Sequence, residues 1–384
     1  MQPRAPVAGV CDARFERVRD AFRDNFDVRG ELGAAVVVYL DGRKVVDLWG
    51  GWAHPDRSRP WREDSLVNVY SVGKAVAVLG VLHCVERGWL DLDRPLAHIW
   101  PAFAQAGKAH ITLRQVLSHR AGLPAISEPL PPGAALDWPR MIRALEQQAP
   151  WWEPGTKHGY HVNTYGYLVG HAVRLAAGQS LGKLLAEHVA APLSSEIYLG
   201  LPESLHERVA DFDYPEEPAL TPPADMSPLE RMRWNAYANP PELSGRGVIN
   251  SAAWRMTELA STNMHASARG VARLYAALAA GGALDGVRVV DAGLLTEARR
   301  EHSVGLDYVL ERPSRFALGF QLTQPERPLG PNPNSFGHHG AGGSLGFCDP
   351  DLGLGFGYVM SSMGPRWQNP RNRALVESVY ACLT

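Results

Sequence analysis

The sequence predicts an α/β (α+β) protein, in which an antiparallel sheet flanked by helices accompanies a mostly helical second domain. Helix-like and strand-like segments both open and close the chain, whereas helical periodicity dominates between them. A chain of 384 residues is also long for a single layered core. We therefore expect one large domain with insertions or two interleaved domains.

The first elements are a predicted helix and a predicted hairpin. Residues 12–27 place apolar side chains among charged ones at a helical period. Residues 34–40 and 44–49 are short β-rich runs, and Asp41-Gly42 between them is a strong hairpin signal. A helix followed by two antiparallel strands indicates a sheet with helices packed on it.

Helices are predicted along the middle of the chain. Their ranges are 75–86, 113–117, a segment within 131–153, and 164–177. Residues 213–241 are rich in proline and acidic side chains, yet apolar residues and tryptophan recur among them. We therefore expect a long excursion or lid there rather than a linker.

Strand patterns return near the end of the chain. After a predicted helix over 266–280, three runs alternate apolar and small residues, at 316–322, 344–349 and 353–360. A helix over 373–382 closes the chain.

These elements predict a discontinuous domain organisation. Residues 1–95 and 255–384 are expected to form an α/β sandwich domain. Residues 96–254 are expected to form a mainly helical domain, with a long loop or lid near 211–245. We expect the active site to lie between the two domains.

Composition excludes several classes of partner. The 38 Lys and Arg residues nearly balance the 40 Asp and Glu residues, and no basic stripe stands out, so we expect neither a nucleic-acid nor a membrane partner. The longest apolar run, 75–82, is too short to span a bilayer, and the N-terminus lacks a signal-peptide core. The histidines and the four cysteines lack metal-site spacing, so no metal or cofactor and a cytoplasmic location are expected (Cys11, Cys84, Cys348, Cys382). The oligomeric state is left open.

A serine and a lysine three residues apart are the first candidates for catalysis. Ser71 and Lys74 precede an apolar, helix-like run, so they are predicted to share one helical face. A desolvated lysine loses its proton more easily and can serve as base to a serine nucleophile. The alternative interpretation is a helix-capping serine followed by a solvated lysine.

Two other serines lie in short motifs that resemble catalytic ones. The G-x-S-x-G pattern occurs at 178–182 and 342–346, and Ser180 with Lys183 repeats the S-x-x-K pattern. A nucleophile elbow requires a strand before the serine and a helix after it. Ser180 lies between two predicted helices and is predicted to cap the second, whereas Ser344 enters a strand with no helix following.

Two further stretches could complete a site around Ser71. Tyr160 ends a turn that feeds a helix, and a phenol beside a lysine ammonium is easier to ionise, so it could act as a general base. Packing under a loop is the alternative for this tyrosine. Residues 336–343 are rich in glycine, which lets a strand approach a ligand closely, although the same pattern fits a flexible strand edge.

Taken in order, these motifs resemble the serine β-lactamase/penicillin-binding-protein superfamily. The closest match is its esterase branch, the family VIII carboxylesterases related to class C β-lactamases. The resemblance covers about residues 15–383 and implies the β-lactamase/DD-peptidase-like fold. It is carried by Ser71-Val-Gly-Lys74, Leu117-Ser-His119, Gly122-Leu-Pro124, the turn from Pro154 to Tyr160, and His338-His-Gly340.

The resemblance also implies a role for each matched residue. Ser71 would be the acylated nucleophile, Lys74 its activating partner, and Tyr160 would share in proton transfer. The backbone N–H groups of Ser71 and Ala341 would form the oxyanion hole.

Two departures from the family pattern affect the expected substrate. His338-His339-Gly340 lies where the family has K-T-G, and these residues are candidates for substrate binding. An imidazole is a poorer carboxylate anchor than the lysine that it replaces. In addition, Asn163 falls one place too late to complete the Tyr-x-Asn motif that would begin at Tyr160. Both departures favour neutral esters over β-lactams.

The sequence therefore predicts a carboxylesterase-type serine hydrolase that acts on a small-molecule ester through an acyl-enzyme on Ser71. A D-peptidase, an amidase or a weak β-lactamase would use the same residues, as would an acyltransferase. A non-catalytic binding protein of the same fold is the alternative outside enzymes.

Overall fold

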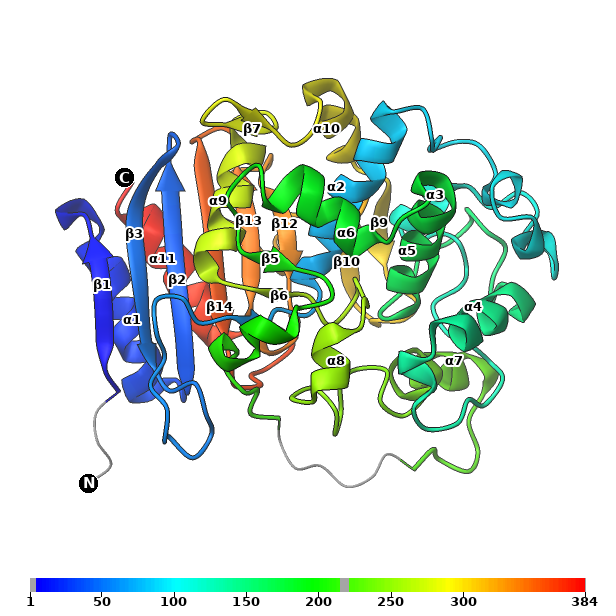
Figure 1. The fold of residues 1–384 in the computed structure, drawn as a ribbon, viewed down its shortest axis with the longest axis horizontal. Coiled ribbons are helices and arrows are strands. Elements are labelled where there is room, and N and C mark those ends of the chain that lie inside the picture. The colour runs from blue at the N-terminus through cyan, green and yellow to red at the C-terminus, as the bar shows by residue number, and fades with distance from the viewer. Residues whose placement is uncertain (1–4, 215–220, 384) are drawn as a thin grey trace.

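A nine-stranded antiparallel sheet organises the computed structural model, which describes residues 5–214 and 221–383 (Figure 1). The spatial order of its strands is β1-β3-β2-β14-β13-β12-β11-β10-β9. The first and last parts of the chain meet where β2 pairs with β14. The strands are β1 (Val7–Cys11), β2 (Gly33–Leu40), β3 (Arg43–Gly51), β9 (Ser303–Leu306), β10 (Pro313–Phe316), β11 (Gln321–Leu322), β12 (Phe336–His339), β13 (Leu345–Asp349) and β14 (Leu354–Met360).

The predicted hairpin is confirmed. Leu40 pairs with Arg43 across a two-residue turn. Asp41 and Gly42 have φ values of 47° and 75°, the left-handed conformations that a type I′ turn requires. The sequence Asp-Gly is therefore found where its conformational preference is needed.

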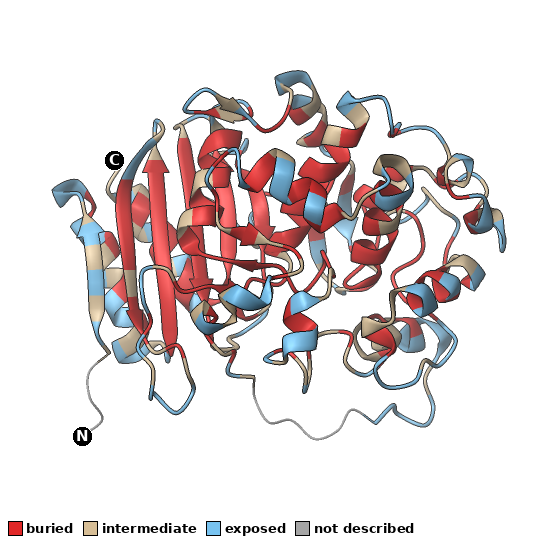
Figure 2. Cartoon of the chain, viewed as in Figure 1, coloured by how far each residue is buried: buried red, intermediate tan, exposed pale blue. Residues whose placement is uncertain are grey.

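Helices cover both faces of the sheet. On one face, α1 (Glu16–Val28) packs against α11 (Pro370–Ala381), so the two ends of the chain lie together (Figure 1). On the other face, α9 (Ala268–Ala279) crosses β13, β14 and β2. Beside it runs α2 (Val72–Glu86), whose side chains are buried along nearly its whole length (Figure 2). This burial explains the continuous apolar run in its sequence.

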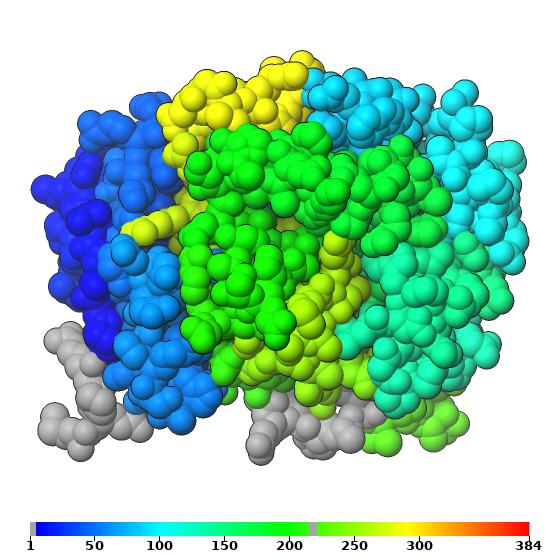
Figure 3. All heavy atoms as spheres, viewed as in Figure 1, coloured from blue at the N-terminus to red at the C-terminus, as the bar shows by residue number. Residues whose placement is uncertain are grey.

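The middle of the chain is helical and loop-rich, as predicted. It carries α3 (Leu113–Leu117), α4 (Trp138–Gln147), α5 (Thr164–Ala177), α6 (Leu181–Leu185), α7 (Pro228–Ala238) and α8 (Ala252–Met256), and α10 (Ala292–Ala298) follows α9. Residues 181–214, drawn in green, cover the centre of the face seen in Figure 3. Within the described residues, every helix is too short or too polar to span a bilayer.

Two small antiparallel sheets complete the strands. One joins β4 (Val67–Asn68), β6 (His265–Ala266) and β5 (Ile197–Tyr198), and the other pairs β7 (Ala283–Leu284) with β8 (Val287–Arg288). Because β4 ends just before Ser71, the first small sheet fixes the approach to α2.

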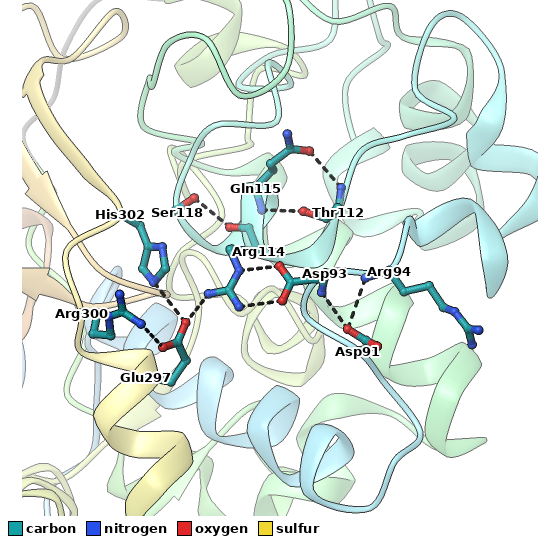
Figure 4. Close-up of polar contacts among 10 residues, drawn as sticks. All are labelled: Asp91, Asp93, Arg94, Thr112, Arg114, Gln115, Ser118, Glu297, Arg300 and His302. Carbon is teal, nitrogen blue, oxygen red and sulfur yellow. Dashed lines mark hydrogen bonds and ion pairs between the residues drawn. The ribbon is translucent and has the colours of Figure 1, made fainter.

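An ion-pair network joins the helical region to α10 (Figure 4). The guanidinium of Arg114 on α3 donates to both carboxylate oxygens of Asp93, at 2.6 and 2.8 Å, and it also pairs with Glu297 of α10. Arg300 donates to the same Glu297 at 2.9 Å. Thr112 and Gln115 form a capping box that begins α3 and sets the position of Arg114.

Some element predictions were wrong. The single strand predicted over 316–322 is divided into β10 and β11, because the chain turns between them and Ala317 N donates to Phe320 O at 2.9 Å. The edge strands β1 and β9 were missed, since neither has a long apolar run. The final helix begins three residues earlier than predicted, because Pro370 is tolerated in the first turn and Asn369 caps it.

Close packing of α9 on the sheet predicts a stability effect. A Cβ atom at Gly357 of β14 would lie 2.6 Å from Ala268 O and 2.6 Å from Ala272 N, both backbone atoms of α9. Gly357→Val should therefore lower the free energy of unfolding by about 1–3 kcal/mol or more. Thermal and urea unfolding would measure it, with Ala253→Val at an exposed position of α8 as control. Equal stability of the two variants would contradict this packing.

Candidate active site

The small sheet and a strained residue position Ser71 at the start of α2. Val69 N donates to Met264 O at 2.8 Å beside β6, and Tyr70 adopts φ 50°, which is uncommon for a non-glycine residue. Ser71 then occupies the capping position of α2, but its side chain makes no capping hydrogen bond. The alternative interpretation of Ser71 as a helix cap is therefore wrong.

Gly73 lets this turn pack tightly against the neighbouring segment. A Cβ atom there would lie 2.8 Å from Ala260 O and 2.9 Å from Met264 Cβ. The carbonyl of Ser261, in the same segment, can consequently reach the amine of Lys74. Close packing therefore explains why a glycine lies between Ser71 and Lys74.

Lys74 is fully buried, with its amine directed at Ser71. Its Nζ lies 3.2 Å from Ser71 Oγ, 2.7 Å from Val162 O and 3.1 Å from Ser261 O. Among the described residues, no carboxylate pairs with it. Burial lowers the pKa of Lys74 well below its ordinary value. A neutral amine has two N–H bonds for the two carbonyls and a lone pair that can accept the Ser71 O–H.

Tyr160 lies over the same amine. The centre of its ring is 4.8 Å from Lys74 Nζ, and the ring stacks on Phe316 of β10 with centroids 5.5 Å apart. Burial raises the pKa of Tyr160, and a hydrogen bond with Ser71 offsets only part of this effect. The expectation that this phenol ionises easily is therefore wrong, because desolvation outweighs the lowering of its pKa by Ser71 and Arg327.

Asp307 holds the backbone at Tyr160. Its carboxylate, fully buried, accepts hydrogen bonds from Tyr160 N at 3.0 and 3.1 Å. It also accepts from Val309 N, Leu310 N and the Ser314 hydroxyl, at 2.9, 2.9 and 3.1 Å. These donors balance the buried charge and tie the Tyr160 turn to the loop between β9 and β10.

The predicted oxyanion-hole residues border one cleft. Ser71 and Ala341 both line it. Neither backbone N–H donates to another backbone or side-chain atom in the described part of the chain. Gly340 N is instead held by Ser344 O at 2.7 Å, which fixes the turn that presents Ala341. The two N–H groups are thus available for a ligand.

The two histidines of β12, His338 and His339, differ in position, because only His339 is among the residues that line the cleft. The ring of His338 contacts two groups: its Nδ1 donates to His339 O at 2.7 Å, and its Nε2 faces the Tyr160 hydroxyl at 3.5 Å. His339 and Gly340 line the cleft, and His339 Nδ1 donates to Gln321 Oε1 at 3.0 Å. Burial lowers the pKa of both histidines well below the ordinary value, so both are neutral.

The cleft has a volume of about 650 Å³. Asn163 lines it despite its offset from the expected motif, and its Nδ2 donates to Ala236 O at 2.8 Å. Three arginines that the sequence interpretation missed also line it. The remaining walls come from Tyr70, Val162, Tyr214, Tyr237, Ser244, Thr262, Leu310, Arg312, Gln321, Arg327, Met363 and Arg366.

The rival serines lie elsewhere. Ser180 caps α6, as predicted, with its hydroxyl accepting from Lys183 N at 3.2 Å and donating to Glu258 at 2.6 Å. Ser344 is fully buried at the entry to β13 and does not line the cleft. No cluster of three His, Cys, Asp or Glu side chains in residues 5–214 and 221–383 is arranged to hold a metal ion.

A serine at a cleft, paired with a buried lysine at the start of a helix that packs on an antiparallel sheet, defines the class of serine β-lactamase and penicillin-binding proteins. The chain belongs to the Beta-lactamase family, whose model matches residues 18–381. The predicted resemblance is thereby confirmed, and with it the fold class.

Individual relatives agree with this assignment. Esterase/beta-lactamase LipL of Mycobacterium tuberculosis is 34% identical over 92% of this chain and 82% of its own. A structure described as a family VIII carboxylesterase superimposes with a TM-score of 0.90 at 38% identity, over 98% of this chain and all of that one. A penicillin-binding protein homologue from Caulobacter crescentus gives 0.89 at 38% identity, with coverage of 98% and 100%.

The role of Asp307 can be tested by one substitution. Both oxygens of the Asp307 carboxylate accept hydrogen bonds. In Asp307→Asn an NH₂ group replaces one of these oxygens and faces the same N–H and O–H donors. The free energy of unfolding should therefore fall by about 1–3 kcal/mol. Turnover should fall as well, since the Tyr160 backbone loses its anchor. Unfolding and ester hydrolysis would be measured together, with Asp351→Asn, on the exposed turn after β13, as control. Unchanged turnover in Asp307→Asn would contradict the positioning role.

Proposed function

We propose that the protein is a serine hydrolase that cleaves carboxylic esters of small molecules through an acyl-enzyme on Ser71. The observation that carries the proposal is the fully buried Lys74 amine, 3.2 Å from the Ser71 hydroxyl and without a carboxylate partner in the described residues. Such an amine becomes available as a base at a lower pH than a solvated lysine does. The relatives named as an esterase and a carboxylesterase support esters as substrates.

The reaction would begin with proton transfer from Ser71 Oγ to Lys74 Nζ as the hydroxyl oxygen attacks the ester carbonyl. The N–H groups of Ser71 and Ala341 would bind the resulting oxyanion, and each such donor contributes roughly 10²- to 10³-fold in rate. As the tetrahedral intermediate collapses, the protonated Lys74 would return the proton to the leaving alcohol through the Tyr160 hydroxyl. A water molecule, deprotonated by Lys74, would then attack the acyl carbon; as the bond to Ser71 Oγ breaks, Lys74 would return the proton to that oxygen and the carboxylic acid would leave.

The high pKa of Tyr160 determines its part in this scheme. Since burial keeps the phenol protonated, Tyr160 would pass a proton along rather than serve as the resting base. His338 Nδ1 carries the ring proton, so Nε2, which faces the Tyr160 hydroxyl at 3.5 Å, would orient that hydroxyl by accepting its O–H. His339 and Gly340 remain candidate substrate contacts on the cleft wall.

β-Lactam hydrolysis is a second candidate, because the name of the relative LipL includes both activities. Amide or D-peptide cleavage and acyl transfer would use the same acyl-enzyme. Rates on p-nitrophenyl esters, nitrocefin and D-Ala-D-Ala would rank the hydrolytic activities, and added alcohol or amine acceptors would reveal acyl transfer. A non-catalytic binding protein would form no covalent adduct with a serine-reactive probe.

We also propose the division into domains 1–95 with 255–384, and 96–254, with the active site between them. Support comes from the cleft, which Ser71 and Ala341 border from one part and Tyr160 and Asn163 from the other. Tyr214 and Tyr237 of the predicted lid line it as well, whereas 215–220 lie outside the described residues. A cytoplasmic location stays a prediction, supported by four cysteines that form no disulfide.

The identity of the nucleophile predicts a sharp difference among three serines. Ser71→Ala should reduce kcat for a p-nitrophenyl ester by at least about 10³-fold, because no other group can form the acyl-enzyme. Ser180→Ala and Ser344→Ala serve as matched controls and should retain turnover. Mass spectrometry with a serine-reactive probe should find the adduct on Ser71. Loss of activity in Ser344→Ala with survival in Ser71→Ala would overturn the assignment.

The lowered pKa of Lys74 predicts how ester hydrolysis depends on pH. Since burial lowers the pKa of Lys74, kcat/KM should rise with pH as the amine loses its proton, with a midpoint well below the ordinary lysine pKa of 10.5. Lys74→Arg should be inactive, because a guanidinium stays protonated. Tyr160→Phe should lose about 10²- to 10⁴-fold in kcat yet keep the same rising limb. Disappearance of that limb in Tyr160→Phe would instead identify the phenolate as base.

A further inference from the structure

Three arginines from separate loops line the cleft that contains Ser71. Arg312 precedes β10, Arg327 lies between β11 and β12, and Arg366 lies between β14 and α11. They are far apart in sequence, so no motif indicated that they converge. Folding of the sheet brings Arg312 and Arg327 together, because β10, β11 and β12 are neighbours.

Aromatic rings, rather than carboxylates, support these guanidinium groups. Arg312 and Arg327 lie 4.1 and 5.6 Å from the centre of the same Trp367 ring, and Arg366 lies 5.4 Å from that of Tyr237. In the described part of the chain, no carboxylate oxygen comes within 4.0 Å of any of the three. Stacking on a ring leaves the N–H edge of a guanidinium free for a planar anion.

Two acids in the loop that leads to Arg312 are committed to other groups. Asp307, which follows β9, is saturated by the donors described above, and Glu311 pairs with Arg233 at 2.6 Å. Among the residues that the structure describes, the Arg327 side chain donates a hydrogen bond only to the backbone oxygen of Arg366, at 3.5 Å. The cleft therefore gathers positive charge without an internal counter-ion from these residues.

Electrostatics agree with this geometry. Burial, followed by repulsion from Arg312, lowers the pKa of Arg327 to about 9. The side chain is still a cation at neutral pH, but a destabilised one. An anion bound between Arg312 and Arg327 would relieve both the repulsion and part of the desolvation, and a carboxylate matches the guanidinium fork.

We propose that the cleft selects esters that carry a carboxylate, with Arg312 and Arg327 as its binding pair and Arg366 at the rim. The proposal rests on the ester hydrolysis proposed above and names its substrate class. It also reverses the expectation of neutral esters, which followed from the histidine in place of the K-T-G lysine. The positive charge absent from β12 is supplied by the loops beside it.

Matched ester pairs would test the proposal and locate the carboxylate. On the acyl side, the mono-4-nitrophenyl ester of terephthalic acid is compared with the 4-nitrophenyl ester of 4-carbamoylbenzoic acid. On the alcohol side, 4-acetoxybenzoate is compared with 4-acetoxybenzamide. In one of these pairs, the wild-type protein should favour the anionic member in kcat/KM by at least about tenfold, the scale of one charge-assisted hydrogen bond.

Arginine variants then connect the preference to the cleft. Arg312→Gln, Arg327→Gln and the double variant should each reduce the anionic-to-neutral ratio of kcat/KM by about tenfold or more, mainly through KM. Arg312→Lys should restore part of the ratio, because it keeps the charge but loses the fork. Arg17→Gln on the exposed surface of α1 is the control and should leave the ratio unchanged. Because each ratio uses a neutral ester as internal reference, partial loss of folded protein does not alter it.

The outcomes separate this proposal from the proposed function. Equal or lower kcat/KM for the anionic member of both pairs, with neutral esters still cleaved through Ser71, would overturn the carboxylate proposal and leave ester hydrolysis standing. A preference that persists in the double arginine variant would also overturn it. If no ester is cleaved by the wild-type protein, the proposed function itself fails.

Discussion

The contact between Lys74 and Ser71 is the interaction on which the rest of the structure depends. An amine in a dry interior without a counter-ion is costly to protonate, and that cost makes it a base. Carbonyls of Val162 and Ser261 satisfy its N–H groups without offering negative charge. A carboxylate in either position would have stabilised the ammonium and removed the chemistry.

Much of the fold can be understood as support for that contact. The small sheet fixes the approach to Ser71, and α2 is buried between the large sheet and the helical region. The second wall of the site arrives from β12 and from the Tyr160 turn, which Asp307 anchors to the loop before β10. Segments distant in sequence therefore meet at the Lys74 amine, and a displacement of any of them would change the contacts of that amine.

Local patterns predicted the elements whose causes are local. The Asp41-Gly42 turn and the helices at 113–117 and 164–177 follow from turn chemistry, capping and periodicity, and they are found as predicted. The pairing of Ser71 with Lys74 is equally local, since it needs only one helical turn. Edge strands β1 and β9 escaped prediction because several of their residues are exposed, so neither has a long apolar run.

The features of the site that the sequence could not reveal depend on the burial of side chains and on which distant residues meet in the folded chain. The ease of ionisation expected for Tyr160 considered the nearby lysine but not desolvation, which is the largest effect on the pKa of Tyr160 and raises it. Asp307 and the arginines of the cleft have no motif, because they come from separate loops that meet at the site only in the folded chain. Neutral histidines on β12 and cationic loops beside it then suggest a substrate different from the one that the histidine substitution indicated.

The protonation state of Lys74 can be measured directly. In protein labelled at the lysine ε-carbon, an NMR titration would follow the Lys74 resonance, assigned by its absence from Lys74→Arg. A midpoint well below 10.5, the ordinary lysine value, is expected. An amine that remains protonated up to about pH 10, as a solvated lysine does, would contradict the role of Lys74 as the base.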